Sequence, residues 1–93
     1  MKLPFCVYVL FSELDRQLYI GYTSNIDRRF EEHCSGQNIS TKNRGPWKLV
    51  FIEYFLFKED AINREKYFKT TVGKRSLKIM LSNTFDTLDY KHK

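Results

Sequence analysis

The stretch "LYIGYTSNIDRRFEEH", which runs from Leu18 to His33, decides the fold of this chain because it joins a strand to a helix through one short turn. Its first residues are rich in β-branched and aromatic side chains, which is typical of a strand, and the strand pattern stops close to Gly21. Ser24 or Asn25 can cap the helix that follows, because short polar side chains accept hydrogen bonds from the free N–H groups of a first turn.

The predicted helix has an apolar stripe along one side. Ile26, Phe30 and Cys34 recur at i, i+4 and i+8, the spacing of one helical face. Gly36 follows the last of them and is typical of the left-handed residue that ends a helix.

Arg29 and His33 lie one turn apart on this helix, beside the apolar stripe. We therefore expect both side chains at the boundary between core and solvent. Two interpretations are open at this point. The pair could be part of a solvated flank on which Glu32 offsets the positive charge, or it could be part of a functional site.

Similar patterns predict the other elements. The polar turn "ELDR" joins two strands into a hairpin, and the later run "KLVFIEYFLF" is apolar enough to form a strand buried on both faces. The order β-β-α-β-α-α indicates an α+β domain over residues 1–83, with a three-stranded, mainly antiparallel sheet flanked by helices, and residues 84–93 are expected to form a loose C-terminal tail. The predicted elements are strands at Phe5–Ser12, Gln17–Thr23 and Lys48–Phe57, a loop at Gln37–Trp47, a helix at 58–73 that ends at Gly73, and a short helix at 74–83.

The composition indicates one globular domain with a basic surface. The chain has 93 residues, of which 42% are apolar, and its net charge is +5. Residues 58–93 contain nine basic and five acidic residues, so most of the positive excess lies in this segment. A basic excess favours a polyanionic partner such as nucleic acid, although solubility alone could also explain it.

Other features bound the class of protein. No stretch approaches the roughly 20 apolar residues of a membrane helix, and we expect a cytoplasmic protein that does not bind membranes. Cys6 and Cys34 form no CxxC pair, so the sequence indicates neither a zinc site nor a disulfide framework. The oligomeric state is open, with a monomer slightly favoured.

Glu65 stands out in the predicted second helix. Ala61, Glu65, Phe68 and Val72 fall on one helical face, and the other three are apolar. A carboxylate in a core-facing stripe needs a partner, since an unpaired buried charge costs several kcal/mol. A structural arginine or a divalent cation could each be that partner.

The first hairpin contributes two tyrosines. Tyr8 and Tyr19 lie on its two strands and can be cross-strand neighbours. Tyrosines in strands are also common core residues, so this signal gains weight only in combination with the others.

This combination resembles the GIY-YIG nuclease superfamily. The resemblance rests on "CVY" at Cys6–Tyr8, "YIG" at Tyr19–Gly21, Arg29, His33, and Glu65 in "AINREKYFK", and it extends from about residue 5 to residue 75. The chain looks like the short stand-alone members related to the nuclease module of the excision-repair protein UvrC. It departs from the family at Cys6 and Val7, where glycine and isoleucine are usual. The late asparagine of many members has only Asn83 as a candidate.

The resemblance implies hydrolysis of a DNA phosphodiester with Mg²⁺ or Mn²⁺ held by Glu65. Arg29 would bind the scissile phosphate, and a tyrosine would activate or orient the attacking water. With a pKa near 10, only about one phenol in a thousand is ionised at pH 7, so His33 could take the phenolic proton. We favour Tyr8 as the base and Tyr19 as its positioning partner, while the exchanged assignment stays open.

The resemblance also suggests roles for glycine and for basic residues. Gly21 would permit a sharp turn from strand to helix and leave room for the substrate. Candidates for contacts to the DNA backbone are Lys42, Arg44, Lys66, Lys69, Lys74, Arg75 and Lys78.

Three functions are therefore compared. The leading one is a DNA endonuclease with little sequence specificity, because 93 residues leave no room for a separate recognition domain, and repair and recombination are candidate roles. The first alternative is a nucleic-acid binding module without catalysis. The second is a protein-interaction domain in which Glu65 and Arg29 form an ion pair.

Overall fold

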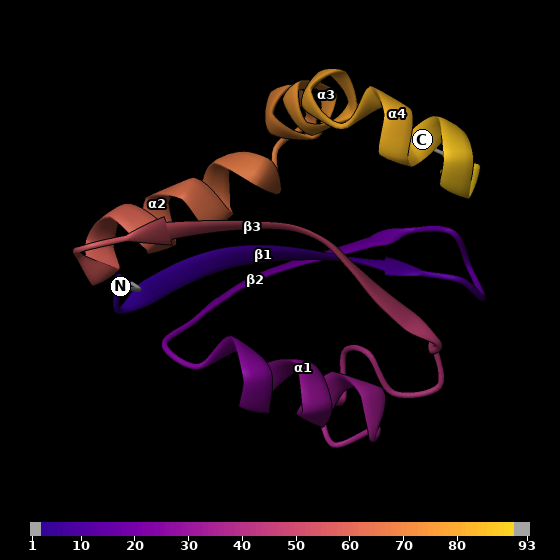
Figure 1. The fold of residues 1–93 in the computed structure, drawn as a ribbon, viewed down its shortest axis with the longest axis horizontal. Coiled ribbons are helices and arrows are strands. Elements are labelled where there is room, and N and C mark those ends of the chain that lie inside the picture. The colour runs from indigo at the N-terminus through magenta and orange to yellow at the C-terminus, as the bar shows by residue number, and fades with distance from the viewer. Residues whose placement is uncertain (1–2, 91–93) are drawn as a thin grey trace.

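The structure, a computed structural model, describes residues 3–90 and consists of one three-stranded sheet between two layers of helices (Figure 1). Helix α1 covers one face of the sheet, and the later helices cover the other. The predicted fold class, an α+β domain with an antiparallel sheet and flanking helices, is confirmed. The elements in chain order are β1 (Phe5–Ser12), β2 (Leu18–Thr23), α1 (Ile26–Cys34), β3 (Trp47–Phe55), α2 (Lys58–Phe68), α3 (Thr71–Met80) and α4 (Ser82–Leu88).

The central strand of the sheet is β1. The strand order is β2-β1-β3, and both neighbours pair with β1 in antiparallel orientation. The prediction that the third strand is buried on both faces was wrong, because β3 is an edge strand and its residues after Trp47 are exposed or half-buried. Instead β1 is buried along almost its whole length, since it has a partner on each side and helices on both faces.

Helices α2 and α3 are separated at a point where the sequence suggested one continuous helix. α2 ends at Phe68, and Thr70 caps α3 by accepting a hydrogen bond from the backbone N–H of Gly73. Gly73 therefore does not end a helix as predicted. It lies in the first turn of α3, where a Cβ atom would be 1.9 Å from the carbonyl oxygen of Tyr67, so only glycine allows this close junction.

The segment predicted as a loose tail contributes to the core. Residues Ser82–Leu88 form helix α4, and its Phe85 packs into the same apolar cluster as Phe68 and Leu77. The prediction of a tail from residue 84 was therefore wrong for the part that the structure describes, and residues 91–93 lie outside the described range. The physical reason is that one buried aromatic side chain is enough to dock a helix too short for a clear periodic pattern.

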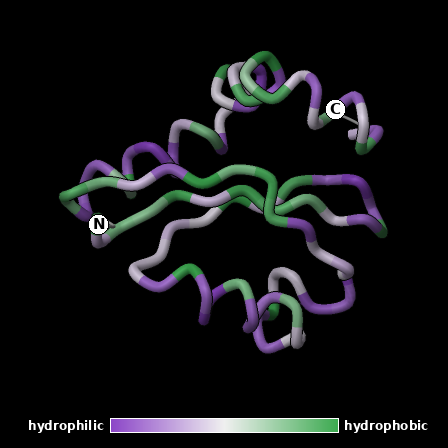
Figure 2. Tube along the Cα trace, in the orientation of Figure 1, coloured by the Kyte–Doolittle hydropathy of each residue, from purple (hydrophilic) through white to green (hydrophobic). Residues whose placement is uncertain are grey.

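The alternation of side chains along β1 gives the sheet two different faces. Val7 and Val9 point toward α2 and α3, whereas Cys6, Tyr8 and Leu10 point toward α1. Figure 2 shows hydrophobic residues concentrated along the strands and mostly hydrophilic residues along α1. Within residues 3–90, no helix is both long and apolar enough to cross a membrane.

Candidate active site

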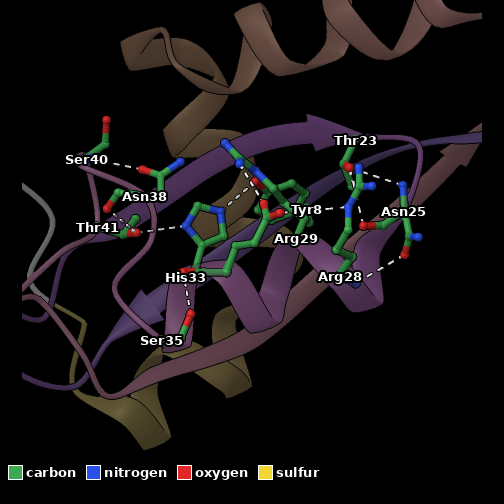
Figure 3. A network of polar contacts seen from close by, with 11 residues as sticks. Tyr8, Thr23, Asn25, Arg28, Arg29, His33, Ser35, Asn38, Ser40 and Thr41 are labelled. Carbon is green, nitrogen blue, oxygen red and sulfur yellow. Dashed lines mark hydrogen bonds and ion pairs between the residues drawn. The ribbon is translucent and has the colours of Figure 1, made fainter.

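A chain of three buried polar side chains lies between β1 and α1 (Figure 3). The hydroxyl oxygen of Tyr8 is 2.8 Å from Nε2 of His33, and Nδ1 of His33 is 2.8 Å from Oγ1 of Thr41. The exposed fractions of these residues are 0%, 1% and 1%. Buried polar groups of this kind are costly unless they are paired, and here each one is hydrogen-bonded.

His33 lies deeper than the sequence predicted. It was expected at the boundary between core and solvent, but it is buried, whereas Cys34 from the predicted stripe is exposed. The buried side of α1 begins at Ile26 and reaches His33 at i+7, which the helical period permits as well as i+8. The Tyr8 hydroxyl stabilises the imidazole in this position.

Gly21 makes room for Tyr8. The two residues are paired across β1 and β2, and a Cβ atom at Gly21 would lie 2.6 Å from the Tyr8 hydroxyl oxygen. The predicted reason for this glycine, a sharp turn between strand and helix, was wrong, because Gly21 lies inside β2. Its missing side chain lets the phenol of Tyr8 lie across the strand and reach His33.

Tyr19 is close to the same imidazole. It pairs with Leu10 rather than with Tyr8, so the two tyrosines are diagonal neighbours on one face of the hairpin. Their ring centroids are 6.3 Å apart, and the Tyr19 ring is 4.7 Å from the His33 ring. Tyr19 is half-buried, so it lies nearer to solvent than Tyr8.

Burial keeps both members of the Tyr8–His33 pair neutral. It raises the pKa of Tyr8 above its ordinary value, and the contact with the Arg29 guanidinium only partly opposes this rise. Burial, together with the positive charge of Arg29, lowers the pKa of His33 to about 4. At neutral pH the site therefore contains a phenol and an uncharged imidazole.

Arg29 connects this buried pair to the surface. A hydrogen bond with Tyr8 is the main reason why the pKa of the guanidinium is raised, and Nη1 is also 3.0 Å from Oε1 of Glu32. The side chain of Arg29 is 34% exposed. It lines an open hollow of about 380 Å³ together with Tyr22, Thr23, Ser24, Arg28 and Glu32.

Glu65 approaches from the other layer of helices. It lies on α2 between the buried residues Ala61 and Phe68, its side chain is 17% exposed, and its Oε2 is 3.5 Å from Nζ of Lys69. Among residues 3–90, its recorded hydrogen bonds and ion pairs do not include Tyr8, Tyr19, Arg29 or His33. The two sites still interact through space, since the negative charge of Glu65 contributes to the raised pKa of Tyr8.

These contacts overturn two expectations. Glu65 and Arg29 do not form the ion pair of the interaction-domain hypothesis, because Glu65 pairs with Lys69 and Arg29 pairs with Glu32. Val72 does not share the buried face of Glu65, because α2 has already ended and Val72 is exposed on α3.

The predicted DNA-contacting residues differ in whether their charged groups are paired with other side chains. The guanidinium of Arg44 has an internal role: it binds Asp15 at 2.7 Å and stacks over Trp47. Lys69 lies beside Glu65. The remaining candidates lie at exposed or half-buried positions, namely Lys42, Lys66, Lys74, Arg75 and Lys78. Asn83 lies on α4, and its recorded contact is with Thr87 of the same helix, so nothing within the described range brings it to the Tyr8 site.

Thr41 is the member of the buried chain that the sequence did not reveal. It lies in the polar segment between α1 and β3, where no periodic pattern marks a residue as buried. Its burial depends on how this loop folds over α1, which is a tertiary effect. A lone threonine among Asn, Ser and Lys carries no signal of that contact.

Comparison with known proteins identifies the family of the chain. The model of the GIY-YIG catalytic domain matches residues 4–78, which is most of the chain and includes Tyr8, Tyr19, Arg29, His33 and Glu65. The chain belongs to the GIY-YIG family.

Small proteins of the UPF0213 group are similar to this GIY-YIG chain over nearly their whole length. A UPF0213 protein of Clostridium perfringens is 35% identical over 86 residues, which cover 91% of each chain. One from Limosilactobacillus reuteri is 36% identical and covers 88% of each. The solution NMR structure of a UPF0213 protein from Bacillus halodurans superposes with a TM-score of 0.50 at 35% identity, covering 82% of this chain and 83% of that one.

Proposed function

We propose that this GIY-YIG chain is a divalent-metal-dependent endonuclease that hydrolyses DNA phosphodiester bonds with little sequence specificity. The observation that carries the proposal is the 2.8 Å hydrogen bond between Tyr8 and His33 beside the Arg29 guanidinium. It supplies a proton acceptor and a phosphate-binding cation at one place. Repair and recombination are the roles in which such an activity would serve.

The Tyr8–His33 pair can activate water without a free phenolate. Because the pKa of Tyr8 is raised, the phenol is protonated at neutral pH and can accept a proton only while it gives up its own. Nε2 of His33 is within hydrogen-bonding distance and is uncharged at pH 7, so it can receive that proton. In this scheme the water's proton passes to Tyr8 as the phenolic proton passes to His33.

Arg29 must change partners for this scheme to operate. Tyr8 has no exposed surface in the free protein, and Arg29 contacts its hydroxyl. If the guanidinium turns toward a phosphate oxygen, it binds the substrate and uncovers the phenol in one movement. The partial exposure of Arg29 beside an open hollow is consistent with such an exchange.

The residues present fit a divalent cation held mainly by its own waters. Residues 3–90 contain no group of three His, Cys, Asp or Glu side chains that could enclose a metal. Glu65 offers one hard carboxylate, which suits Mg²⁺ because this ion keeps several waters and takes further oxygens from phosphate. When bound, the ion would stabilise negative charge on the phosphate and on the leaving oxygen.

The position of Glu65 is compatible with this assignment. β2 is an edge strand, so a side chain from α2 can reach its free edge without passing through the sheet. The phenol of Tyr8 lies across Gly21 of the same strand, and the charge of Glu65 acts on it. Lys69 would have to release the carboxylate, which is a small cost because this lysine is exposed.

A cleavage assay tests the proposal. Nicked, branched and single-stranded DNA are incubated with Mg²⁺ or Mn²⁺ and the wild type, Glu65→Ala or Arg29→Ala. We expect cleavage by the wild type, and loss of cleavage in both variants while DNA binding by Glu65→Ala persists. Glu59→Ala is the matched control, because Glu59 is an exposed glutamate on the same helix. A folded wild type that binds DNA but cleaves none of these substrates with either metal would instead favour the non-catalytic binding module.

A further inference from the structure

We propose that Thr41 is a positioning residue whose hydroxyl holds His33 in the tautomer with the proton on Nδ1, so that Nε2 is free to accept a proton from Tyr8. The tautomer follows from the hydrogen bonds at both ends of the imidazole. The catalytic consequence rests on the proposed nuclease function, but the tautomer can be measured without it.

The first constraint is at Nδ1. Oγ1 of Thr41 is 2.8 Å from Nδ1 of His33 and 3.3 Å from the carbonyl oxygen of Asn38. A carbonyl oxygen can only accept, so with the proton on Nδ1 the Thr41 hydroxyl accepts from His33 and donates to Asn38, and both contacts are hydrogen bonds. With Nδ1 unprotonated, the single hydroxyl proton of Thr41 could serve only one of the two, so the Nδ1–H form is the one that satisfies both.

The second constraint is at Nε2. Arg29 can only donate, so the Tyr8 oxygen accepts in their hydrogen bond. The Tyr8 proton then has Nε2 of His33 as its acceptor at 2.8 Å. In the other tautomer, the Tyr8 oxygen would accept from both Arg29 and Nε2–H of His33. The buried hydroxyl proton of Tyr8 would then lose Nε2 as its acceptor, which costs about 1 to 3 kcal/mol. Both ends of the ring therefore select the same tautomer.

The loop around Thr41 is anchored, so its hydroxyl is kept at the imidazole. The carbonyl oxygen of Thr41 accepts from Nε1 of Trp47 at 3.3 Å and from the backbone N–H of Arg44 at 3.2 Å. The guanidinium of Arg44 in turn binds Asp15 in the β1–β2 turn, and the carbonyl oxygen of Arg44 accepts a hydrogen bond from the Ser12 hydroxyl. The segment that supplies the second partner of His33 is thus tied to the sheet that supplies Tyr8.

The tautomer matters because the opposite one would block proton transfer. With the proton on Nε2, the imidazole would donate to Tyr8 and could not accept the phenolic proton. Removing the Thr41 hydroxyl should therefore lower the rate of the chemical step while it leaves the affinity for the substrate largely unchanged. Loss of a hydrogen-bond partner that fixes the tautomer of a functional histidine has this kind of effect.

The test combines NMR with kinetics on the whole protein. Long-range ¹H–¹⁵N spectra report which ring nitrogen carries the proton, and the spectrum of His33→Gln separates His33 from His92, the other histidine of the chain. We compare the wild type with Thr41→Val, which keeps the shape without the hydroxyl, and with Thr41→Ser, which keeps the hydroxyl. Thr87→Val is the control, since it removes a hydroxyl from α4 that donates to the backbone of Asn83.

We expect the Nδ1–H tautomer in the wild type, in Thr41→Ser and in Thr87→Val. In Thr41→Val we expect a partial shift toward Nε2–H, because Nδ1–H has lost its acceptor while Tyr8 still favours the Nδ1–H form. The kcat for DNA cleavage should fall about 10- to 100-fold in Thr41→Val with little change in KM, and Thr41→Ser should restore it. An Nε2–H tautomer in the wild type, or an unchanged tautomer in Thr41→Val, would overturn the proposal. If Thr41→Val does not fold, Thr41→Ala and the wild-type spectrum decide the question. A wild type with the expected tautomer but no cleavage would refute the nuclease function alone.

Discussion

The two faces of the sheet have different interiors although they share the strand β1. The face toward α2, α3 and α4 is lined by an apolar cluster whose buried members are Val7, Val9, Ile20, Ala61, Phe68, Leu77 and Phe85. The face toward α1 also has apolar residues, but it encloses the phenol of Tyr8, the imidazole of His33 and the hydroxyl of Thr41.

The apolar cluster and the buried polar chain are expected to differ in how much they contribute to the stability of the fold. Buried apolar area stabilises a small domain, whereas buried hydroxyl and imidazole groups add little net stability because they have also lost their hydration. Net stability therefore does not by itself account for the polar groups of the α1 face, to which the proposed function assigns proton transfer. Substitutions in the apolar cluster and in the Tyr8–His33–Thr41 chain should consequently act on different measured quantities.

Tyr8→Phe should have the largest effect on catalysis. It removes the proton relay, and the cleavage rate should fall about 10²- to 10⁴-fold. The free energy of unfolding should fall by only about 1 to 3 kcal/mol, because Nε2 of His33 loses its donor. Single-turnover cleavage and urea unfolding measure the two effects. Tyr67→Phe, on the face of α2, is the control, and equal rate losses in both variants would contradict the separation of the faces.

Phe68→Ala should show the opposite behaviour. Phe68 is fully buried, and its ring lies 5.8 Å from that of Phe51 and 4.3 Å from the guanidinium of Arg64. Truncation should lower the free energy of unfolding by about 3 to 5 kcal/mol. The cleavage rate per folded molecule should stay unchanged, which is measured at a temperature where the variant is folded. Val72→Ala, at an exposed position of α3, should change stability by no more than about 0.5 kcal/mol. A large loss of rate in folded Phe68→Ala would show that the apolar face also shapes the site.

The buried imidazole should make stability depend on pH. The pKa of His33 is about 4 in the folded protein, and the reference value for an unfolded chain is about 6.5. Between these values the unfolded state binds a proton and the folded state does not, so stability should fall as the pH is lowered through this range. The expected loss is on the order of 2 to 3 kcal/mol.

Urea unfolding between pH 4 and pH 7 checks this expectation by comparing the wild type with His33→Gln. The variant should lack this part of the pH dependence, while the contributions of the carboxylates remain the same in both proteins. If the free energy of unfolding changed with pH by the same amount in both proteins, the fold would not be holding His33 in its neutral form.

Gly21→Ala tests how closely the hairpin positions the phenol. The added methyl group would lie 2.6 Å from the Tyr8 hydroxyl oxygen, so the ring has to move away from His33. A displacement of this kind should lower the cleavage rate by about 10- to 100-fold.

Gly36→Ala is the matched control for Gly21→Ala. Gly36 has φ +79°, and nothing lies within 4 Å of an added Cβ atom. This variant should lose about 1 to 2 kcal/mol of stability from backbone strain without losing activity. A fully active Gly21→Ala protein would refute the tight fit of Tyr8 across β2.

Local sequence patterns predicted those parts of the fold that local interactions determine. The hairpin and α1 were predictable because both strands are rich in β-branched and aromatic residues and Asn25 caps the helix, where it accepts a hydrogen bond from the N–H of Arg28 at 3.1 Å. The α2–α3 boundary was missed because Gly73 was interpreted as a helix end. Thr70, three residues before Gly73, is the N-cap that divides the two helices.

The candidate site was predictable as a set of residues but not as an arrangement. The resemblance to a known family named Tyr8, Tyr19, Arg29, His33 and Glu65. Burial of His33, by contrast, depends on a partner 25 residues away on β1, and Thr41 depends on a loop held by tertiary contacts. Neither contact leaves a periodic pattern in the sequence.

The proposed function requires Tyr8 and Arg29 from the α1 face to act on the same phosphate as Glu65 from α2. A crystal of the protein with Mn²⁺ and a non-cleavable DNA strand tests this most directly. We expect an anomalous Mn²⁺ signal beside the Glu65 carboxylate, with a phosphate that is shared between the ion and Arg29 and faces the Tyr8 hydroxyl. A bound phosphate that contacts Arg29 while the Mn²⁺ signal lies elsewhere, or no signal near Glu65, would contradict it.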